Sequence, residues 1–294
     1  MPKLSIIVTT YNVEAYVQQC LDGLTSQTFK DIEIIVVDDG SSDGTPRIIR
    51  DSAARDDRIR PIFFETNTIG GVASAANAGL EAATGDFIGF ADGDDIYDPR
   101  MFEALYNAAM DHNADLVMCH YHVLDVSTGR LTEPADDRQW LAFPETTSIA
   151  LDDESRRQIL RFIAVPWRKV YRRDLVERTS LRFPVGDYFY EDNPFHWAAV
   201  LAAGRIAMVP ERLCQHRQGR AGQTMTAAGT RILRLFDHHD TIRDLLRAQG
   251  VEDQFRGELL RWVAMQLSWI SQQVDSDVKK PLYDCLVPIL SLIH

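Results

Sequence analysis

The segment FIGFADGDDIY, residues 87–97, decides the fold, because a short apolar run ends directly at the carboxylates Asp92, Asp94 and Asp95. Such a run predicts a buried strand, and α/β sheets bind their ligands where such strands end. Three carboxylates within four residues repel one another, and a cluster of this kind persists when a cation neutralises it. The segment therefore predicts a divalent metal, Mn²⁺ or Mg²⁺, that bridges to a diphosphate. The alternative is an acidic turn with Gly93 at positive φ.

Two earlier segments extend this strand into a sheet. Leu4–Thr9 and Ile32–Val37 are continuous β-branched runs, and the helical spacing of Ala15–Gln27 between them makes a strand–helix–strand unit. The alternation continues with strands at Ile59–Phe64 and Leu116–His120 and helices at Pro46–Arg55, Gly71–Ala83 and Pro99–His112. This order predicts an α/β, Rossmann-like fold with a mostly parallel sheet flanked by helices.

The second half of the chain has weaker patterns. Ser127–Asp153 is polar and weakly periodic, and we expect a loop or insertion there. Ile159–Ile163 predicts a helix, and Pro166–Tyr171 predicts a strand. From about Thr230 the apolar spacing becomes helical, with Gly250 between two helices. The chain should therefore end in a C-terminal helical appendage.

The composition excludes several classes of function. The formal net charge of −12 over 294 residues argues against nucleic acid as a partner, because phosphate binding needs a basic surface. No apolar run approaches the ~18–20 residues that span a bilayer. Residues 1–4 lead directly into a predicted strand, and they do not form the charged region followed by an apolar region that is typical of a signal peptide. The four cysteines are far apart and predict free thiols, so we expect a cytoplasmic protein.

Two further carboxylate pairs are candidates for chemistry. Asp38 and Asp39 follow a predicted strand. A carboxylate there can accept a hydrogen bond from the N–H of a nucleobase or from a ribose hydroxyl. Glu191 and Asp192 lie among aromatic residues, and an apolar setting raises a carboxyl pKa and suits a general base. The alternative for both pairs is a turn that caps the next helix.

Basic residues are concentrated in two places in this acidic chain. Lys169 and Arg217 are the candidates to neutralise a diphosphate or to bind an anionic acceptor. Arg172 and Arg173 are expected on a solvated face. His216 is expected to be an ordinary loop histidine, and a metal-binding role for it stays open.

Taken in order, these motifs resemble the family 2 glycosyltransferases, which have the GT-A fold. The resemblance covers about the first 220 residues. Besides the acidic cluster and the pair at 191–192, it rests on SIIVTTYN (5–12), SQTF (26–29), VDDGSSDGT (37–45) and GGVASAANAG (70–79). It implies a GT-A domain over residues 1–226, with a nucleotide-sugar-binding half (1–98) and an acceptor-binding half (99–226), followed by a helical region (227–294).

The resemblance implies an inverting enzyme that moves a sugar from a UDP-sugar to a hydroxyl of a carbohydrate or lipid-linked glycan, in the synthesis of bacterial surface polysaccharide or glycoconjugates. Asp94 would bind the metal, and Asp192, with Glu191 beside it, would be the base. The expected donor contacts are Thr9, Tyr11 and Asp39 with the nucleobase, Asp92 with the ribose or sugar, and Lys169 and Arg217 with the diphosphate.

The C-terminal segment from Leu282 to Ile293 is apolar and would be a sticky surface if exposed. Three roles are open for it: packing on the catalytic domain, pairing with a second subunit, or peripheral contact with the inner face of the membrane, where lipid-linked acceptors reside.

Other functions on similar folds fit the sequence less well. An NAD-dependent dehydrogenase needs G-x-G-x-x-G after the first strand, but the turn Thr9–Asn12 contains no glycine. A sugar nucleotidyltransferase needs a glycine-rich basic loop at the same place, which is also absent. A non-catalytic binding or scaffold protein stays open, although the presence of Asp39, Asp94 and Asp192 argues against it.

Overall fold

The computed structural model describes residues 2–187, 189–220, 223, 229–271 and 278–290. Its described strands form one ten-stranded sheet with the order β3-β2-β1-β4-β9-β6-β10-β5, to which β7 adds beside β6 and β8 beside β10. The strands are β1 (Leu4–Thr10), β2 (Ile32–Asp38), β3 (Ile59–Phe63), β4 (Phe87–Asp92), β5 (Ile96–Tyr97), β6 (Leu116–Asp125), β7 (Leu131–Thr132), β8 (Thr147–Ala150), β9 (Lys169–Arg172) and β10 (Arg205–Gln218).

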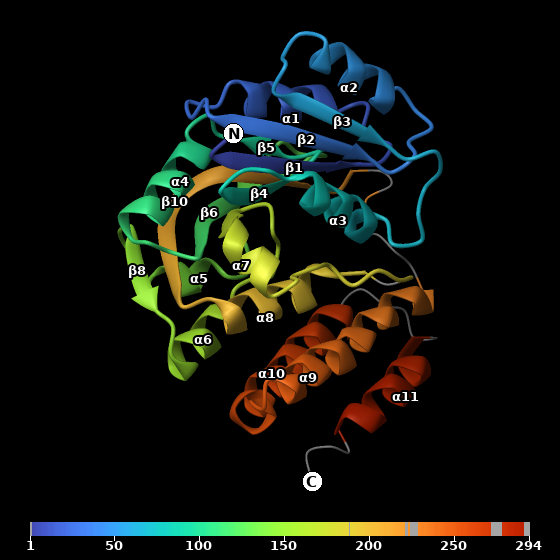
Figure 1. Ribbon diagram of the computed structural model, residues 1–294. Coiled ribbons are helices and arrows are strands. Elements are labelled where there is room, and N and C mark those ends of the chain that lie inside the picture. Colours follow the sequence, from blue (N-terminus) through green and yellow to red (C-terminus); the bar gives the residue numbers. More distant parts are fainter. Residues whose placement is uncertain (1, 188, 221–222, 224–228, 272–277, 291–294) are drawn as a thin grey trace.

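Helices cover the sheet, and the C-terminal helices gather beyond α8 (Figure 1). The helices are α1 (Val17–Thr25), α2 (Thr45–Ala53), α3 (Val72–Ala82), α4 (Met101–Asp111), α5 (Asp137–Trp140), α6 (Asp153–Ile159), α7 (Arg173–Arg178), α8 (Asp192–Ala202), the 3-10 helix η2 (Gly229–Phe236), α9 (Asp237–Ala248), α10 (Glu252–Ser271) and α11 (Lys279–Leu290).

The first four strands of the sheet order pair in parallel, as the sequence predicts. Parallel neighbours need crossover connections, which α1, α2 and α3 supply between β1, β2, β3 and β4. Beyond β4 the sheet is mixed, because β9 runs antiparallel to both β4 and β6, while β6 and β10 are parallel. The α/β fold class with a C-terminal helical region is therefore confirmed.

Alternate residues of β1 divide the core between the two faces of the sheet. Ile6 and Val8 belong to a buried cluster with Leu21 of α1 and Leu105 of α4. Ile7, which points the other way, belongs to a second cluster with α3, α8 and the C-terminal helices. The sheet is therefore buried on both faces, in agreement with its continuous apolar strands.

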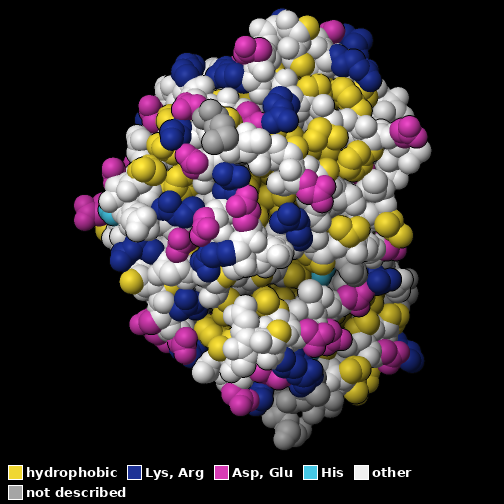
Figure 2. Space-filling model, viewed as in Figure 1, with side chains coloured by type: hydrophobic (Ala, Val, Ile, Leu, Met, Phe, Trp, Pro, Cys, Tyr) yellow, Lys and Arg dark blue, Asp and Glu magenta, His cyan; other side chains and the backbone are white. Residues whose placement is uncertain are grey.

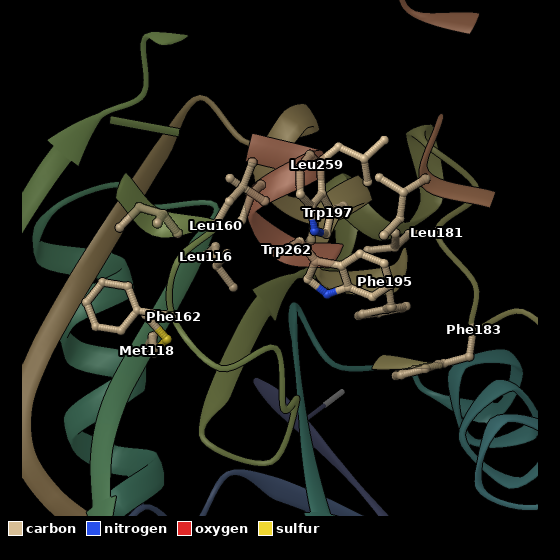
Figure 3. Packing of buried hydrophobic residues seen from close by; sticks show 14 of the residues in the cluster. Leu116, Met118, Leu160, Phe162, Leu181, Phe183, Phe195, Trp197, Leu259 and Trp262 are labelled. Atoms are coloured by element: carbon tan, nitrogen blue, oxygen red, sulfur yellow. The ribbon is translucent and has the colours of Figure 1, made fainter. Parts of the chain in front are cut away.

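The C-terminal helices share the second cluster. Leu259 and Trp262 of α10 lie in the same buried cluster as Trp197 of α8 (Figure 3). Glu258 of α10 also pairs with Arg161 at 2.8 Å. The described helices of the appendage therefore share a buried cluster with the rest of the chain, and Leu282, Leu286 and Ile289 of α11 belong to that cluster. Among the described residues, no helix is long and apolar enough to cross a bilayer.

Several sequence-based expectations for the second half were wrong. The helix predicted at residues 159–163 lies earlier: α6 begins at Asp153, where Asp152 and Ser155 form a reciprocal capping box, and ends at Ile159. Residues 127–153 contain β7, α5 and β8. The pattern also does not predict the fourteen-residue β10, because Pro210 and two register shifts interrupt its alternation.

Charges of both signs intermix on the surface. On the face shown in Figure 2, Lys and Arg side chains lie among Asp and Glu side chains, so this face offers no broad basic surface. The four cysteines are free, as expected. The predicted boundary between residues 226 and 227 and the end of the apolar tail, residues 291–293, lie outside the described residues.

Candidate active site

The loops after β1 and β2 interlock at the carboxyl edge of the sheet. Thr10 is aligned with Asp38 across the two strands. The N–H of Asn12 donates to Ser41 Oγ at 2.8 Å, and Asn12 Oδ1 accepts from the N–H of Ser42 at 2.9 Å. Asn12 has a φ of 48°, a left-handed conformation that asparagine tolerates. The two loops therefore form one continuous surface.

Asp38 and Asp39 have different surroundings. Asp38 accepts from the N–H of Ser41 at 3.0 Å and therefore caps its own turn. Asp39 accepts from Asn67 Nδ2 at 2.8 Å and from the N–H of Thr68 at 3.1 Å, and burial raises its pKa. Asp39 thus ties the loop after β3 to the ends of β1 and β2.

The acidic cluster begins beside Thr9, which is aligned with Asp92 across β1 and β4. The N–H of Gly93 donates to the carbonyl of Thr9 at 3.0 Å, and the N–H of Asp92 donates to Tyr97 Oη at 2.7 Å. A Cβ at position 93 would lie 2.6 Å from Thr10 Cγ2, so only glycine allows this approach. Gly93 is needed for space and not for the positive φ of the alternative interpretation.

Asp95 is fully buried and pairs with His216 of β10. The distance from Asp95 Oδ2 to His216 Nδ1 is 2.9 Å, and the N–H of Arg217 donates to Asp95 Oδ1 at 2.9 Å. Trp167 stacks on the imidazole with a centroid distance of 5.0 Å. Burial lowers the pKa of His216, but the nearby carboxylates, Asp95 foremost, outweigh burial and raise it to about 9. A cationic His216 therefore offsets the charge of Asp95.

Asp94 is contacted by two arginines. The guanidinium of Arg220 donates to the carboxylate of Asp94, and that of Arg217 donates to the Asp94 carbonyl and to Gln19 Oε1. Arg217 also lies 5.1 Å from the centroid of the Tyr16 ring. The side chains of Asp94 and Arg220 are 9% and 12% exposed, so water screens this ion pair only weakly.

The cluster also contains a group of side chains that could hold a metal ion. Ligand atoms of Asp92, Asp95 and His216 lie within 4.8 Å of one another. Carboxylate oxygen and imidazole nitrogen together suit Mn²⁺, and carboxylate oxygen alone suits Mg²⁺. The residues present therefore fit a divalent ion, which Asp94 would join once Arg220 released it.

Glu191 and Asp192 lie at the start of α8 and are partly buried. Burial raises the pKa of Asp192 to about 6 and that of Glu191 to about 7. The rings of Phe90 in β4 and Phe195 in α8 meet edge to face with centroids 5.8 Å apart, which brings the start of α8 close to the end of β4. Burial and the carboxylates of Asp95, Asp94 and Asp192 together raise the pKa of Asp92. Asp192 is thus a carboxylate with enhanced basicity beside the acidic cluster.

Lys169, the other basic candidate, is hydrogen-bonded to backbone carbonyls. It is fully buried, and its ammonium donates to the carbonyl oxygens of Ala164 and Val165, both at 2.8 Å. Burial lowers its pKa well below the usual value. These hydrogen bonds stabilise the turn before β9, and the charge of Lys169 partly offsets the rise that burial causes in the pKa of Asp192.

Comparison with known proteins identifies the family. Residues 5–179 match the family described as glycosyl transferase family 2. The chain belongs to this family. A Bacillus subtilis (strain 168) relative named uncharacterized glycosyltransferase EpsJ is 39% identical over 74% of this chain and 62% of its own length. This glycosyltransferase therefore spans about three fifths of that relative.

Solved structures share the fold of this family 2 glycosyltransferase. A fragment of S. aureus TarS in complex with UDP-GlcNAc has a TM-score of 0.78 at 24% identity, over 97% of this chain and 79% of the other. The mannosyltransferase PcManGT from Pyrobaculum calidifontis, in complex with GDP-Man and Mn²⁺, has a TM-score of 0.58 at 19% identity, over 99% and 80%. These likenesses establish the GT-A fold.

Within the glycosyltransferase fold, most predicted site residues come together. Thr9 and Asp92 lie at adjacent strand ends, next to the loop that carries Tyr11, which is 46% exposed. The sequence did not indicate that His216 and Arg220 pair with Asp95 and Asp94. Arg217, the candidate for the donor phosphate, lies beside this cluster and donates to the Asp94 carbonyl. The only available signal was a basic run near residue 216 in an acidic chain.

Proposed function

We propose that this family 2 glycosyltransferase moves a sugar from a UDP-sugar to an acceptor hydroxyl with inversion at the anomeric carbon. The observation that carries the proposal is the position of Asp192, a carboxylate of raised pKa beside the acidic cluster at the strand ends. A base and a stabilised leaving group are the two elements that a single displacement needs. This differs from the paired carboxylates that hydrolyse glycosides.

We propose that Thr9, Tyr11 and Asp39 hold the nucleobase and that Asp92 contacts the ribose or the sugar. The ends of β1, β2 and β4, which carry or adjoin these residues, are neighbours in the sheet. Asp39 keeps acceptor capacity beyond its two bonds to the loop after β3, so it can accept from a base N–H. Uracil as the base is supported by the family resemblance and by the UDP-GlcNAc bound to TarS.

We propose a divalent metal, Mn²⁺ or Mg²⁺, at the acidic cluster, with Asp94 as its principal ligand and Asp92 and His216 beside it. Such an ion supplies Lewis-acid stabilisation of the departing diphosphate. His216 would ligate the ion through Nε2 after that nitrogen lost its proton to solvent, while the N–H at Nδ1 stayed on Asp95 and oriented the ring. Asp94 becomes available when the guanidinium of Arg220 leaves it. Mn²⁺ in PcManGT supports this choice of ion.

Asp192 is the proposed general base. It takes the proton from the acceptor hydroxyl while that oxygen attacks the anomeric carbon and the bond to the diphosphate breaks. A pKa of about 6 keeps the carboxylate charged at neutral pH and makes it a stronger base than an ordinary aspartate. Glu191, with a pKa of about 7, is its acidic neighbour.

The proposed acceptor is a carbohydrate or a lipid-linked glycan, in the synthesis of bacterial surface polysaccharide or glycoconjugates, which the family resemblance supports. We assign residues 1–98 to donor binding, 99–226 to acceptor binding and 227–294 to the helical region. The proposed location is cytoplasmic. Flotation with liposomes and sedimentation test the two remaining roles of the C-terminal helices, contact with the inner face of the membrane and formation of a homo-oligomer.

A turnover assay tests this function. The chain is incubated with a panel of UDP-sugars, Mn²⁺ and glycan acceptors, and released UDP is measured for the parent, Asp192→Asn, Asp94→Asn and the control Asp111→Asn, which changes an exposed residue of α4. We expect Asp192→Asn to lower turnover by about 10²-fold or more while UDP binding is kept. Full turnover in that variant would remove Asp192 as the base. A non-catalytic scaffold would bind UDP and release none.

A further inference from the structure

The C-terminal helices contact the segment that carries Glu191 and Asp192 at three points. From α9, His238 Nε2 donates to the carbonyl of Phe189 at 2.8 Å. From α10, the ring of Trp269 meets the ring of Tyr190 edge to face, with centroids 5.4 Å apart. Trp262, one helical heptad before Trp269 on the same helix, donates its indole N–H to Asn193 Oδ1 at 2.8 Å. Residues 189–193 are therefore held by helices that lie outside the matched family segment.

The bond from Trp262 decides which way the amide of Asn193 faces. An indole N–H can only donate, so it must meet the amide oxygen. The amide nitrogen must then point the other way, where it donates to Asp192 Oδ1 and to the carbonyl of Tyr190, both at 3.0 Å. Trp262 and Asn193 are 6% and 8% exposed, so water cannot readily replace this contact.

The opposite orientation of the Asn193 amide would be unfavourable for the proposed base, Asp192. With its oxygen toward Asp192, Asn193 would set a lone pair against the carboxylate and would leave the indole N–H of the buried Trp262 without an acceptor. The indole therefore selects the one amide orientation that donates to Asp192. A hydrogen bond to one carboxylate oxygen restricts the rotation of that carboxylate and stabilises its charged form.

We propose that Trp262 is a positioning residue for transfer, which acts through the amide of Asn193 to orient the carboxylate of Asp192. The inference rests on the proposed function, because it needs Asp192 as the base. It gives the C-terminal helical region a part in the reaction, because α10 orients the proposed base through the amide of Asn193.

The test is a double-mutant cycle on kcat. Trp262→Phe keeps a buried ring and removes the N–H, and Asn193→Ala removes the amide without altering α10. We expect each change to lower kcat about tenfold, with the KM for the UDP-sugar and the Kd for UDP within about twofold of the parent. The double variant should be no slower than Asn193→Ala alone, because Trp262 acts only through that amide.

A matched control separates the hydrogen bond from ring packing. Trp140 belongs to the same buried cluster, and its indole N–H has no hydrogen-bond partner within the described part of the chain. Trp140→Phe should therefore keep the parent kcat. In ¹⁵N-tryptophan-labelled protein, the indole resonance absent from Trp262→Phe should shift in Asn193→Ala, which reports the bond independently of turnover.

Two results would overturn the inference. One is a parent kcat in Trp262→Phe, and the other is an equal further loss when Trp262→Phe is added to Asn193→Ala. If Asp192→Asn is inactive in the same assay, either result removes only the role of Trp262 and leaves the proposed function in place. If Asp192→Asn keeps full turnover, the base assignment fails first.

Discussion

The pH dependence of transfer should report the ionisation of Asp192. Burial raises its pKa from 3.8 to about 6, so at about pH 5 only about a tenth of the molecules carry the charge that a base needs. We therefore expect kcat/KM to fall about tenfold between about pH 7.5 and pH 5. An aspartate at its ordinary pKa of 3.8 would lose less than about a tenth of its activity over the same range.

Glu191 lies next to Asp192 and titrates in the same range, with a pKa of about 7. Two neighbouring carboxylates share their titration steps, so Glu191→Gln is needed to isolate Asp192. In Glu191→Gln, the profile of kcat/KM against pH should still fall on the acid side, with a single midpoint near or slightly below pH 6. The assay is UDP release at constant ionic strength, with return to pH 7.5 as the control for unfolding. A profile flat down to about pH 5 in both proteins would refute the assignment.

The same pKa shift predicts a stability cost. Between about pH 4 and 6 the folded state binds the Asp192 proton more tightly than the unfolded state, so the free energy of unfolding falls as pH rises through this window. Asp192→Asn removes the charge and should raise the free energy of unfolding at about pH 7.5 by about 1–2 kcal/mol, allowing for partial exposure. The gain should vanish near about pH 4. Urea titrations at both pH values check this, and a variant less stable at the higher pH would contradict it.

Three further changes test other contacts. Arg220→Gln should tighten Mn²⁺ binding in the absence of donor about tenfold, measured by electron paramagnetic resonance of free Mn²⁺, because the guanidinium no longer competes for Asp94. Arg168→Met should lower the free energy of unfolding in urea by about 3–5 kcal/mol, because it leaves the buried carboxylate of Asp136 unpaired, and Arg168→Met with Asp136→Leu should recover most of that loss. Asp39→Asn should weaken UDP binding in calorimetry about tenfold, because one carboxylate acceptor becomes a donor.

Each of these expectations has a contradicting result. The control Arg47→Gln changes an exposed arginine of α2 and should leave the Mn²⁺ affinity of the parent unchanged. If Arg220→Gln also keeps the parent affinity, the guanidinium of Arg220 does not compete with Mn²⁺ for Asp94. An equal loss of stability in Arg168→Met and in the double variant would assign the effect to packing instead of charge. Unchanged UDP affinity in Asp39→Asn would exclude that carboxylate from the nucleobase site.

The donor side of the candidate site could be predicted from local sequence. Parallel strands place their carboxyl ends at one edge of a sheet, so Thr9, Asp39 and Asp92, at or just after the ends of three predicted strands, were expected at the same edge. The observed order β2-β1-β4 then makes these strand ends neighbours. The pair Glu191 and Asp192, among aromatic residues, could be singled out as the candidate base segment. The boundaries of the second half could not, because strands such as β10 have an interrupted period.

The sequence by itself determined the fold class and the candidate site residues, because both depend on short-range patterns and on the types of side chain. Only the tertiary structure decided which groups face each other: Asp95 meets His216 across 121 positions, and Trp262 meets Asn193 across 69. These contacts depend on the register of β10 and on how α10 packs against α8. Neither is encoded in local periodicity, because many pairings bury similar apolar area and the complete core selects one of them.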